Sequence, residues 1–150
     1  MREWYLQTGL YLLDSRKANE PTEAQRLVTD VKGEAYTKIN PNGRAPAIED
    51  PNTGITLWES GAILEYLVET YDRDNKISYA SFPEKYHTKQ YLHFQMSGQG
   101  PYFGQTTWFR HFHSEKVESA RKRYDEQLVR VVGVLDNILA GKQYLVGDKP

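Results

Sequence analysis

A carboxylate next to a hydroxyl marks the first candidate binding residues in this sequence. Glu59 and Ser60 stand directly before an apolar, helix-periodic segment, so they fall where a helix is expected to begin. The first turn of a helix presents unpaired N–H groups and the positive end of the helix dipole, which suit a carboxylate or a phosphate. With Glu59 placed to hold an ammonium group, the pair indicates a site for an amino acid. The alternative is structural: Ser60 is an ordinary N-cap and Glu59 a first-turn charge.

The dipeptide Ala45-Pro46 lies upstream of this pair, where a strand is expected to begin. Proline has no N–H to donate to a ladder, so it belongs at the first residue or the edge of a strand. A cis bond here would turn the backbone of Ala45 outward, where its N–H and C=O can pair with an extended, peptide-like ligand as an added strand does. The residues alone favour the alternative, an ordinary trans proline at a strand start.

Two cations lie on the approach to the same strand. Arg44 immediately precedes Ala45, and Lys38 lies earlier in the chain. Either side chain can pair with a second carboxylate of a ligand. The alternative for both is ordinary solvated surface charge, because exposed ion pairs contribute little to stability.

A hairpin and a helix must position these residues. Residues 47–49 and 55–58 flank the sequence DPNTG, whose Pro, Asn and Gly are typical of a tight turn, so a β-hairpin is predicted. A helix is predicted to begin at Ser60, with apolar residues on one face at spacings of three and four. That buried face is expected to consist of Ile63, Leu64, Leu67, Val68 and Tyr71.

The rest of the chain is predicted to be a polar linker followed by helices. Residues 72–82 are polar and irregular, and residues 83–113 predict a long helix that is kinked or broken at 97–101, where two Gly and a Pro occur. Ser114 is the predicted N-cap of a further helix that Gly141 ends. Its apolar stripe consists of Val117, Ala120, Tyr124, Leu128, Val131, Leu135 and Ile138. Upstream, residues 10–14 are interpreted as a strand, and a short helix is expected from Asn19 to about Thr29.

Composition excludes several classes of function. The chain has 150 residues and a net charge of −1, so no general field favours nucleic acid or an anionic membrane. No apolar run approaches the ~20 residues that span a bilayer, and the first residues do not follow the signal-peptide pattern, so a cytoplasmic location is expected. The chain has no Cys, and its four His lack the spacing of a metal site, so neither a cysteine nucleophile nor a metal is expected.

Two blocks of sequence resemble the glutathione S-transferase family. Residues 40–67, NPNGRAPAIEDPNTGITLWESGAILEYL, resemble the second half of its thioredoxin-like domain. The helical part is similar to the fungal nitrogen-regulator-like and bacterial disulfide-reductase-like branch, through YLHFQMSGQGPYFGQTTWFRHFH, RYDEQL, VLDNIL and YLVGDK. The resemblance runs from about Asp30 to the end, and both blocks occur in the order and spacing of the family.

The resemblance implies an α/β plus all-α fold. A thioredoxin-like glutathione-binding domain is expected over residues 1–72, a linker over 73–82 and a helical C-terminal domain over 83–150. Within residues 1–39 the first strand and helix of the family are atypical or missing. The chain also ends before the helix that follows LVGDK in the family, so the C-terminal domain is expected to be incomplete.

The resemblance also implies a set of site residues. The Ala45-Pro46 bond is expected to be cis, with the backbone of Ala45 paired to the cysteinyl residue of glutathione. Glu59 and Ser60 are expected to hold the γ-glutamyl end, with Arg44 as a helper. No residue is assigned to catalysis, because the Tyr, Ser, Cys, Thr or Asn that stabilises the glutathione thiolate in the family belongs to the atypical first segment.

The implied function is that of a glutathione-binding transferase. It conjugates glutathione to small electrophiles or reduces disulfides with glutathione, needs no metal and forms a homodimer. Because glutathione supplies the sulfur, the absence of Cys does not oppose this reading. The alternatives are a non-catalytic regulatory or interaction module of the same family and an inactive truncated product.

Overall fold

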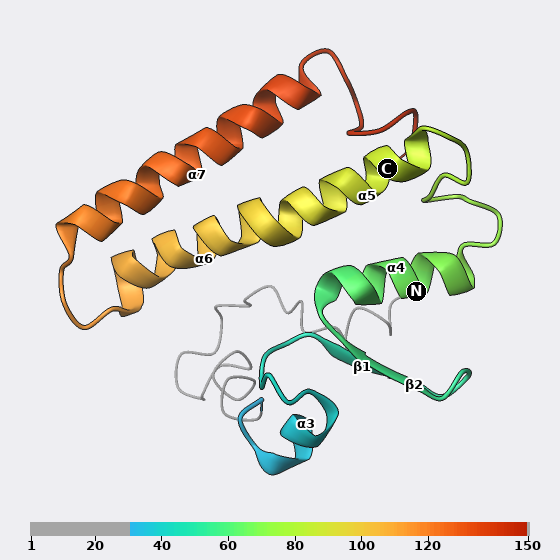
Figure 1. The fold of residues 1–150 in the computed structure, drawn as a ribbon, viewed down its shortest axis with the longest axis horizontal. Helices are drawn as coiled ribbons and strands as arrows, with labels where there is room; N and C mark the ends of the chain where they lie inside the picture. The colour runs from blue at the N-terminus through green and yellow to red at the C-terminus, as the bar shows by residue number, and fades with distance from the viewer. Residues whose placement is uncertain (1–30, 150) are drawn as a thin grey trace, which may run out of the picture. The chain divides into compact units, whose positions relative to one another are not determined.

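The computed structural model describes residues 31–149 as two compact units, the first ending at Leu67 and the second beginning at Val68. In chain order the elements are α3 (Glu34–Ile39), β1 (Ala47–Asp50), β2 (Ile55–Trp58), α4 (Ser60–Tyr71), α5 (Glu84–Phe94), η1 (Gln95–Gln99), α6 (Gly100–Thr107), η2 (Trp108–Phe112) and α7 (Glu118–Leu139) (Figure 1). The expected strand at 10–14 and the short helix from Asn19 lie outside the described residues. The predicted domain limits, 1–72 and 83–150, stay a prediction.

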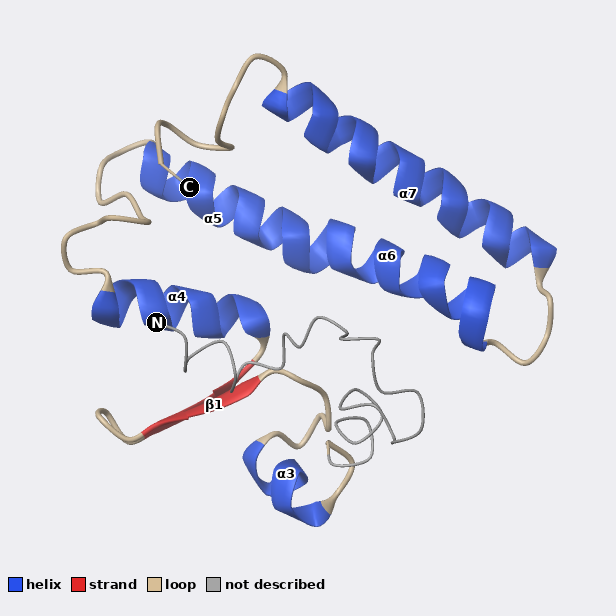
Figure 2. Cartoon of the chain, turned by 180° about the vertical axis from the view of Figure 1, so that it is seen from behind, coloured by secondary structure: helices blue, strands red, loops and turns tan. Residues whose placement is uncertain are grey.

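The predicted hairpin is confirmed. Strands β1 and β2 pair antiparallel, with Ala47 opposite Trp58 at one end and Asp50 opposite Ile55 at the turn (Figure 2). The Asp50 carbonyl accepts the Gly54 N–H at 2.8 Å, and Gly54 has a φ of 74° that glycine adopts without strain. The Asp50 side chain accepts the N–H of Asn52 at 2.9 Å, which closes the turn from within. Local turn chemistry therefore sets the register.

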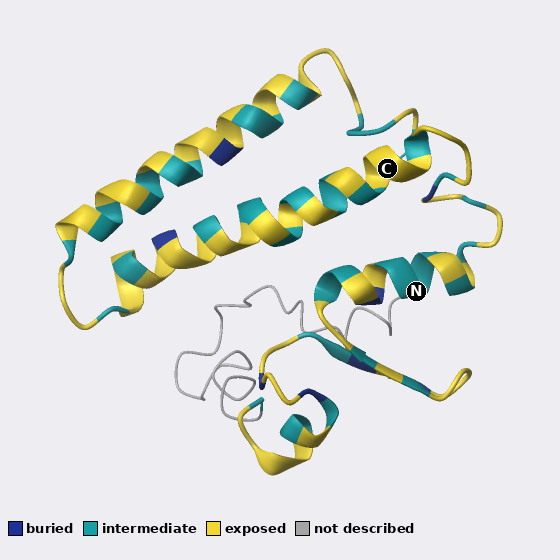
Figure 3. Ribbon diagram, in the orientation of Figure 1, coloured by how far each residue is buried: buried dark blue, intermediate teal, exposed yellow. Residues whose placement is uncertain are grey.

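Helix α4 begins at Ser60 as predicted, but its buried face is narrower than expected. Ile63 is 3% exposed, whereas Leu64 is 48% exposed and Tyr71 45%. Figure 3 shows half-buried and exposed residues along most of α4. The prediction of a buried position is wrong for Leu64 and Tyr71. Neighbouring residues on a helix point about 100° apart, so Leu64 faces away from the side of α4 that buries Ile63. The helix is tied to the hairpin turn by the Tyr66 hydroxyl, which donates to the buried carboxylate of Asp50.

The predicted irregularity of the long helix is confirmed as a π-helical segment and not as a break. Over η1 the helix widens by one residue per turn, and the Gly100 N–H reaches the Gln95 carbonyl. The helix then continues into α6, whose second residue, Pro101, follows directly on the π-helical segment. A second π-helical segment, η2, follows α6 and has no counterpart in the predictions.

Helix α7 packs against α6 through its predicted apolar stripe. Val131 in that stripe has no exposed surface, and Gly141, with a φ of 70°, follows the helix end as expected. The prediction of Ser114 as N-cap is wrong, because Val117 holds the cap position without a side-chain bond. The turn before α7 is closed instead by the His113 ring, whose Nδ1 accepts the Glu115 N–H at 3.1 Å.

The segment from 72 to 83 contains no helix or strand, as its composition indicates. It is nevertheless ordered by the Asp72 carboxylate. That group accepts the Ser78 hydroxyl at 2.6 Å and the N–H groups of Lys76 at 2.7 Å and Ile77 at 3.1 Å. Ser78 is buried as a result. A single carboxylate thus folds this segment onto itself.

Candidate functional site

The hairpin register brings the predicted site residues to one end of the first unit. Because Ala47 is paired with Trp58, the residues just before β1 and just after β2 lie at the same, open end of the hairpin. Ala45 and Pro46 precede β1, and Glu59 with Ser60 follows β2. Two segments that the sequence separates by a strand, a turn and a second strand are therefore neighbours.

The Ala45-Pro46 bond is cis, as the family resemblance implies, and the trans form that the residues alone favoured is wrong. Arg44 and Ala45 are exposed, and Pro46 is half-buried. Lys38, the other cation considered for the site, is exposed and paired with Glu34 of the same helix at 3.0 Å. Its position agrees with the alternative of solvated surface charge.

Glu59 has a backbone conformation that is unusual for a residue with a side chain. Its φ is 75°, a left-handed conformation that costs a residue with a side chain about 1–2 kcal/mol. Its carbonyl accepts the Ile63 N–H at 3.0 Å, so Glu59 and not Ser60 is the N-cap of α4. Ser60 is the first helical residue, half-buried beside the exposed Glu59. Strained residues of this kind concentrate at ligand sites.

Sequence reasoning missed two residues that shape the loop before Ala45. Asn40, 2% exposed, donates from Nδ2 to the Arg44 carbonyl at 2.5 Å, and the Tyr36 hydroxyl donates to the same oxygen at 2.9 Å. The signal for Asn40 was present in the sequence, because Asn before Pro-Asn-Gly is typical of a side chain that bonds its own turn. No signal of spacing points to Tyr36.

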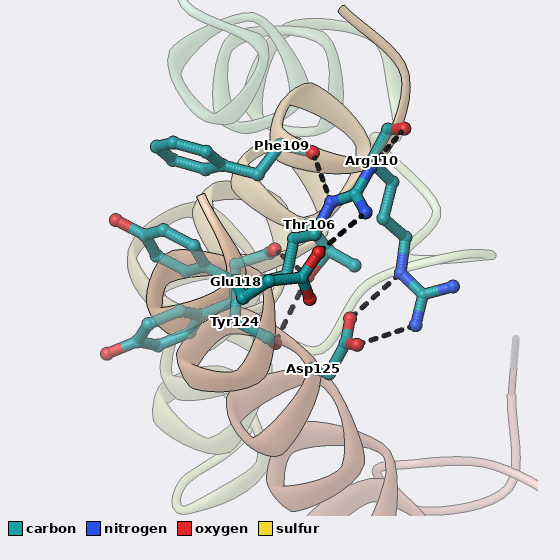
Figure 4. Close-up of polar contacts among 8 residues, drawn as sticks. Thr106, Phe109, Arg110, Glu118, Tyr124 and Asp125 are labelled. Carbon is teal, nitrogen blue, oxygen red and sulfur yellow. Dashed lines mark hydrogen bonds and ion pairs between the residues drawn. The ribbon is translucent and has the colours of Figure 1, made fainter. Parts of the chain in front are cut away.

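Two clefts lie in the second unit, and neither contains a predicted site residue. The larger, about 580 Å³, is lined by charged side chains of η2 and α7. There Arg110 donates to both carboxylate oxygens of Asp125 at 2.9 and 2.7 Å, and Arg121 donates to the Phe109 carbonyl at 3.0 Å (Figure 4). The Arg110 hydrogen bonds lower the pKa of Asp125 below its ordinary value. Both arginines form hydrogen bonds within the protein. The side chains of this cleft therefore connect η2 to α7.

The described part of the chain offers neither a metal site nor a membrane span. Among residues 31–149, no group of three His, Asp or Glu side chains is arranged to hold a metal ion. No helix described in the structure combines the length and the apolar character that crossing a bilayer requires. The open end of the hairpin therefore remains the strongest candidate site.

Comparison of the sequence with a family model and with curated proteins points to the same family. Residues 23–69 match the family described as glutathione S-transferase, N-terminal domain. The chain is 50% identical over 131 residues to the glutathione S-transferase-like protein gedE of Aspergillus terreus, a match that covers 81% of this chain and 58% of gedE.

Solved structures extend the match to both units. The crystal structure of the glutathione transferase URE2P6 from Phanerochaete chrysosporium, in complex with oxidized glutathione, is 48% identical with a TM-score of 0.74 and covers 79% of this chain and 56% of that one. Ure2p5 of the same organism, cocrystallized with 1-(S-glutathionyl)-2,4-dinitrobenzene, is 46% identical with a TM-score of 0.70 and covers 77% and 54%. The chain thus spans little more than half the length of the relatives it matches.

Proposed function

The chain belongs to the glutathione S-transferase family, with relatives of the Ure2 type, and from this premise we propose that it binds glutathione at the open end of the β1–β2 hairpin. The observation that carries the proposal is the register, which places Ala45 and Pro46 beside Glu59 and Ser60. Related structures crystallised with glutathione species support it.

Each site residue has a proposed partner on the tripeptide. The backbone N–H and C=O of Ala45 pair with the cysteinyl residue as an added strand would, with Pro46 between Ala45 and the start of β1. The first-turn N–H groups of α4 and the Ser60 hydroxyl bind the γ-glutamyl carboxylate, and the Glu59 carboxylate binds the adjacent ammonium group. Arg44, exposed next to Ala45, pairs with the glycyl carboxylate.

We propose two reaction classes for the bound thiol. In conjugation, the glutathione thiolate forms a bond to an electrophilic carbon and a leaving group departs. In disulfide reduction, the glutathione thiolate attacks one sulfur of a disulfide, which forms a mixed disulfide with glutathione and releases the other sulfur as a thiol. The thiolate of a second glutathione then attacks the glutathione sulfur of the mixed disulfide, which gives oxidized glutathione and releases the second thiol. The chain has no Cys, so glutathione supplies the reacting sulfur in both. The residue that stabilises the thiolate is unassigned, and most of the segment in which the family places it lies outside residues 31–149.

Two further properties are proposals that rest on the family. A homodimer is expected, and size-exclusion chromatography with light scattering measures it directly. A cytoplasmic location is expected as well, and fractionation of the source cells tests it. Neither property enters the assignment of the site.

Binding and turnover are tested separately on the full chain. Isothermal titration with glutathione measures binding, and two assays measure turnover: conjugation of 1-chloro-2,4-dinitrobenzene and reduction of bis(2-hydroxyethyl) disulfide by glutathione. Binding with turnover in either assay supports the proposed enzyme. Binding without turnover supports the non-catalytic module, and a chain that does not bind glutathione contradicts the proposal.

Replacing Ser60 by Ala tests the site itself. The variant loses a donor to a charged carboxylate, so we expect the Kd for glutathione to rise about tenfold or more. Ser114→Ala, a change of the same kind at an exposed position of the second unit, is the matched control and leaves the Kd unchanged. Equal affinity of Ser60→Ala and the wild type would show that the γ-glutamyl end is bound elsewhere.

A further inference from the structure

The peptide group that joins Arg44 to Ala45 is held at its carbonyl oxygen by two hydrogen-bond donors. Its carbonyl, that of Arg44, accepts Asn40 Nδ2 at 2.5 Å and the Tyr36 hydroxyl at 2.9 Å. A carbonyl oxygen has two lone pairs, so these two donors use its full hydrogen-bonding capacity. Tyr36 belongs to α3 and Asn40 is its C-cap, so no strand or ligand is needed to hold this oxygen.

The Asn40 amide is itself fixed on every side. Its backbone N–H donates to the Tyr36 carbonyl at 2.9 Å, and its backbone carbonyl accepts the Gly43 N–H at 2.9 Å. Its side-chain Oδ1 accepts the Asn42 N–H at 3.0 Å, which leaves Nδ2 directed at the Arg44 carbonyl. With 2% of its surface exposed, Asn40 has little room to adopt another rotamer. The donor is therefore held rigidly relative to α3.

Anchoring the oxygen also orients the opposite edge of the same peptide group. Arg44 and Ala45 are joined by a planar trans peptide, in which C=O and N–H point in opposite directions. When Asn40 and Tyr36 hold the carbonyl, the Ala45 N–H is directed away from them, and Ala45 is exposed. An N–H fixed before the ligand arrives loses less conformational entropy on binding.

We propose that Asn40 and Tyr36 are positioning residues that set the Ala45 N–H for the peptide backbone of the ligand. The inference rests on the proposed function, because it takes glutathione as the ligand that meets Ala45. It adds residues that do not touch the ligand and act through the Arg44–Ala45 peptide plane. Their loss weakens the cysteinyl contact and leaves the γ-glutamyl contacts at Ser60 in place.

Two variants of the full chain remove the donors one at a time. Tyr36→Phe keeps the ring and deletes one hydroxyl. Asn40→Asp keeps the size and the acceptor for Asn42 but sets an oxygen against the Arg44 carbonyl. Tyr66→Phe is the matched control, because its hydroxyl bonds Asp50 in the hairpin turn and does not reach Arg44. Circular dichroism confirms that each variant is folded, and Tyr36→Phe carries the test if Asn40→Asp does not fold.

The first measurement is made by NMR without ligand. The carbonyl ¹³C shift of Arg44 is expected to move in Tyr36→Phe and in Asn40→Asp and to stay in Tyr66→Phe, because it reports the hydrogen bonds to that oxygen. An unchanged shift in both donor variants would contradict the anchoring and would overturn the inference without reference to glutathione.

The second measurement is a glutathione titration of the same proteins. We expect the Kd to rise about fivefold in each donor variant, with a smaller shift of the Ala45 amide on saturation and an unchanged shift of the Ser60 amide. A purely structural role would alter both amides together. Donor variants that match wild type in Kd and in the Ala45 shift overturn the inference. A wild-type chain that shows no titration at all overturns the proposed function, and this inference with it.

Discussion

At the scale of single residues, the backbone of Glu59 is the most unusual feature of the site. Its φ of 75° is a conformation that glycine adopts freely and glutamate does not. The chain keeps a carboxylate there, between the end of β2 and the first turn of α4. Strain that is retained beside a helix N-terminus agrees with a functional need for this side chain.

Two substitutions separate the conformation of Glu59 from its charge. Glu59→Ala keeps the strain and removes the carboxylate, whereas Glu59→Gly removes both. We expect Glu59→Gly to be more stable than Glu59→Ala by up to about 1 kcal/mol in urea unfolding, because relief of the left-handed strain outweighs the added freedom of glycine in the unfolded chain. Both variants should bind glutathione more weakly than wild type. Equal stability of the pair would mean that position 59 is not strained.

At the scale of elements, polar side chains join α7 to the helix before it. Thr106, 6% exposed, places its hydroxyl 2.8 Å from the Tyr102 carbonyl and 3.1 Å from the Tyr124 carbonyl of α7. At the end of η2, the Arg121 guanidinium lies against the Phe109 and Arg110 carbonyls at 3.0 and 3.3 Å (Figure 4). These carbonyls end a helix and need donors from outside it. A side chain of α7 thus supplies the hydrogen-bond donors that the end of η2 lacks.

Thr106 offers a direct measure of this connection. Thr106→Val keeps the shape and removes the hydroxyl, so we expect the free energy of unfolding to fall by about 1 kcal/mol. Thr106→Ser, which keeps the hydroxyl, should retain the bond to Tyr124. Thr107→Val at the exposed neighbouring position is the control and should change little in the same urea titration. If Thr106→Val is as stable as Thr107→Val, the hydroxyl does not contribute to the packing of α7.

The stability that Asp72 gives to the segment between α4 and α5 depends on pH. The Ser78 hydroxyl, together with the N–H groups of Lys76 and Ile77 and the Lys149 cation, lowers the pKa of Asp72 below its ordinary value of 3.8, against the opposing effect of partial burial. The folded protein therefore takes up this proton at a lower pH than the unfolded chain does. The stabilisation is fully present above about pH 4 and is lost as the pH falls through the depressed pKa.

Asp72→Asn tests that sign. The variant should unfold at lower urea than wild type at pH 7, and the difference should shrink as the pH is lowered to 3. Asp74→Asn, at an exposed position nearby, is the control and should show a smaller difference at pH 7. A gap between Asp72→Asn and wild type that stays constant from pH 7 to pH 3 would contradict the assignment.

At the scale of the whole chain, full burial of apolar side chains is scarce. Among residues 31–149, the buried hydrophobic residues are Ile48, Ile63 and Val131. Within the second unit, polar ties fasten the last described residues to the segment before α5. The Tyr79 hydroxyl accepts the N–H groups of Asp148 at 2.8 Å and Lys149 at 3.0 Å. Lys149 Nζ donates to the Ser78 carbonyl at 2.8 Å and lies 4.3 Å from the Tyr79 ring centroid.

Tyr79→Phe removes the acceptor from this arrangement and keeps the ring. We expect faster hydrogen exchange at the Asp148 and Lys149 amides and a loss of about 1 kcal/mol in the free energy of unfolding. Tyr86→Phe, at a residue that is 62% exposed, is the matched control and should leave both amides as protected as in wild type. Unchanged exchange in Tyr79→Phe would show that the hydroxyl does not hold the C-terminal segment.

Prediction from sequence was accurate where the signal was local. The turn DPNTG, the helix that begins at Ser60 and the irregularity predicted at 97–101 follow from residue types within a few positions of each other. It was wrong where several local caps compete or where packing decides. Ser114 has the chemistry of an N-cap, yet the ring of the neighbouring His113 closes that turn and α7 begins later. Leu64 has the spacing of a core residue, yet it lies exposed beside the buried Ile63.

By itself, the sequence determined the family, the hairpin and the residue types at the candidate site, because turn chemistry and hydrophobic period are properties of short segments. Only the tertiary structure decided the strained backbone of Glu59, the pairing of Ala47 with Trp58 and the use of Asn40 and Tyr36 to hold the Arg44 carbonyl. The partner of a buried polar group depends on how a loop closes against its neighbours in space. Residue spacing along the chain does not contain that information.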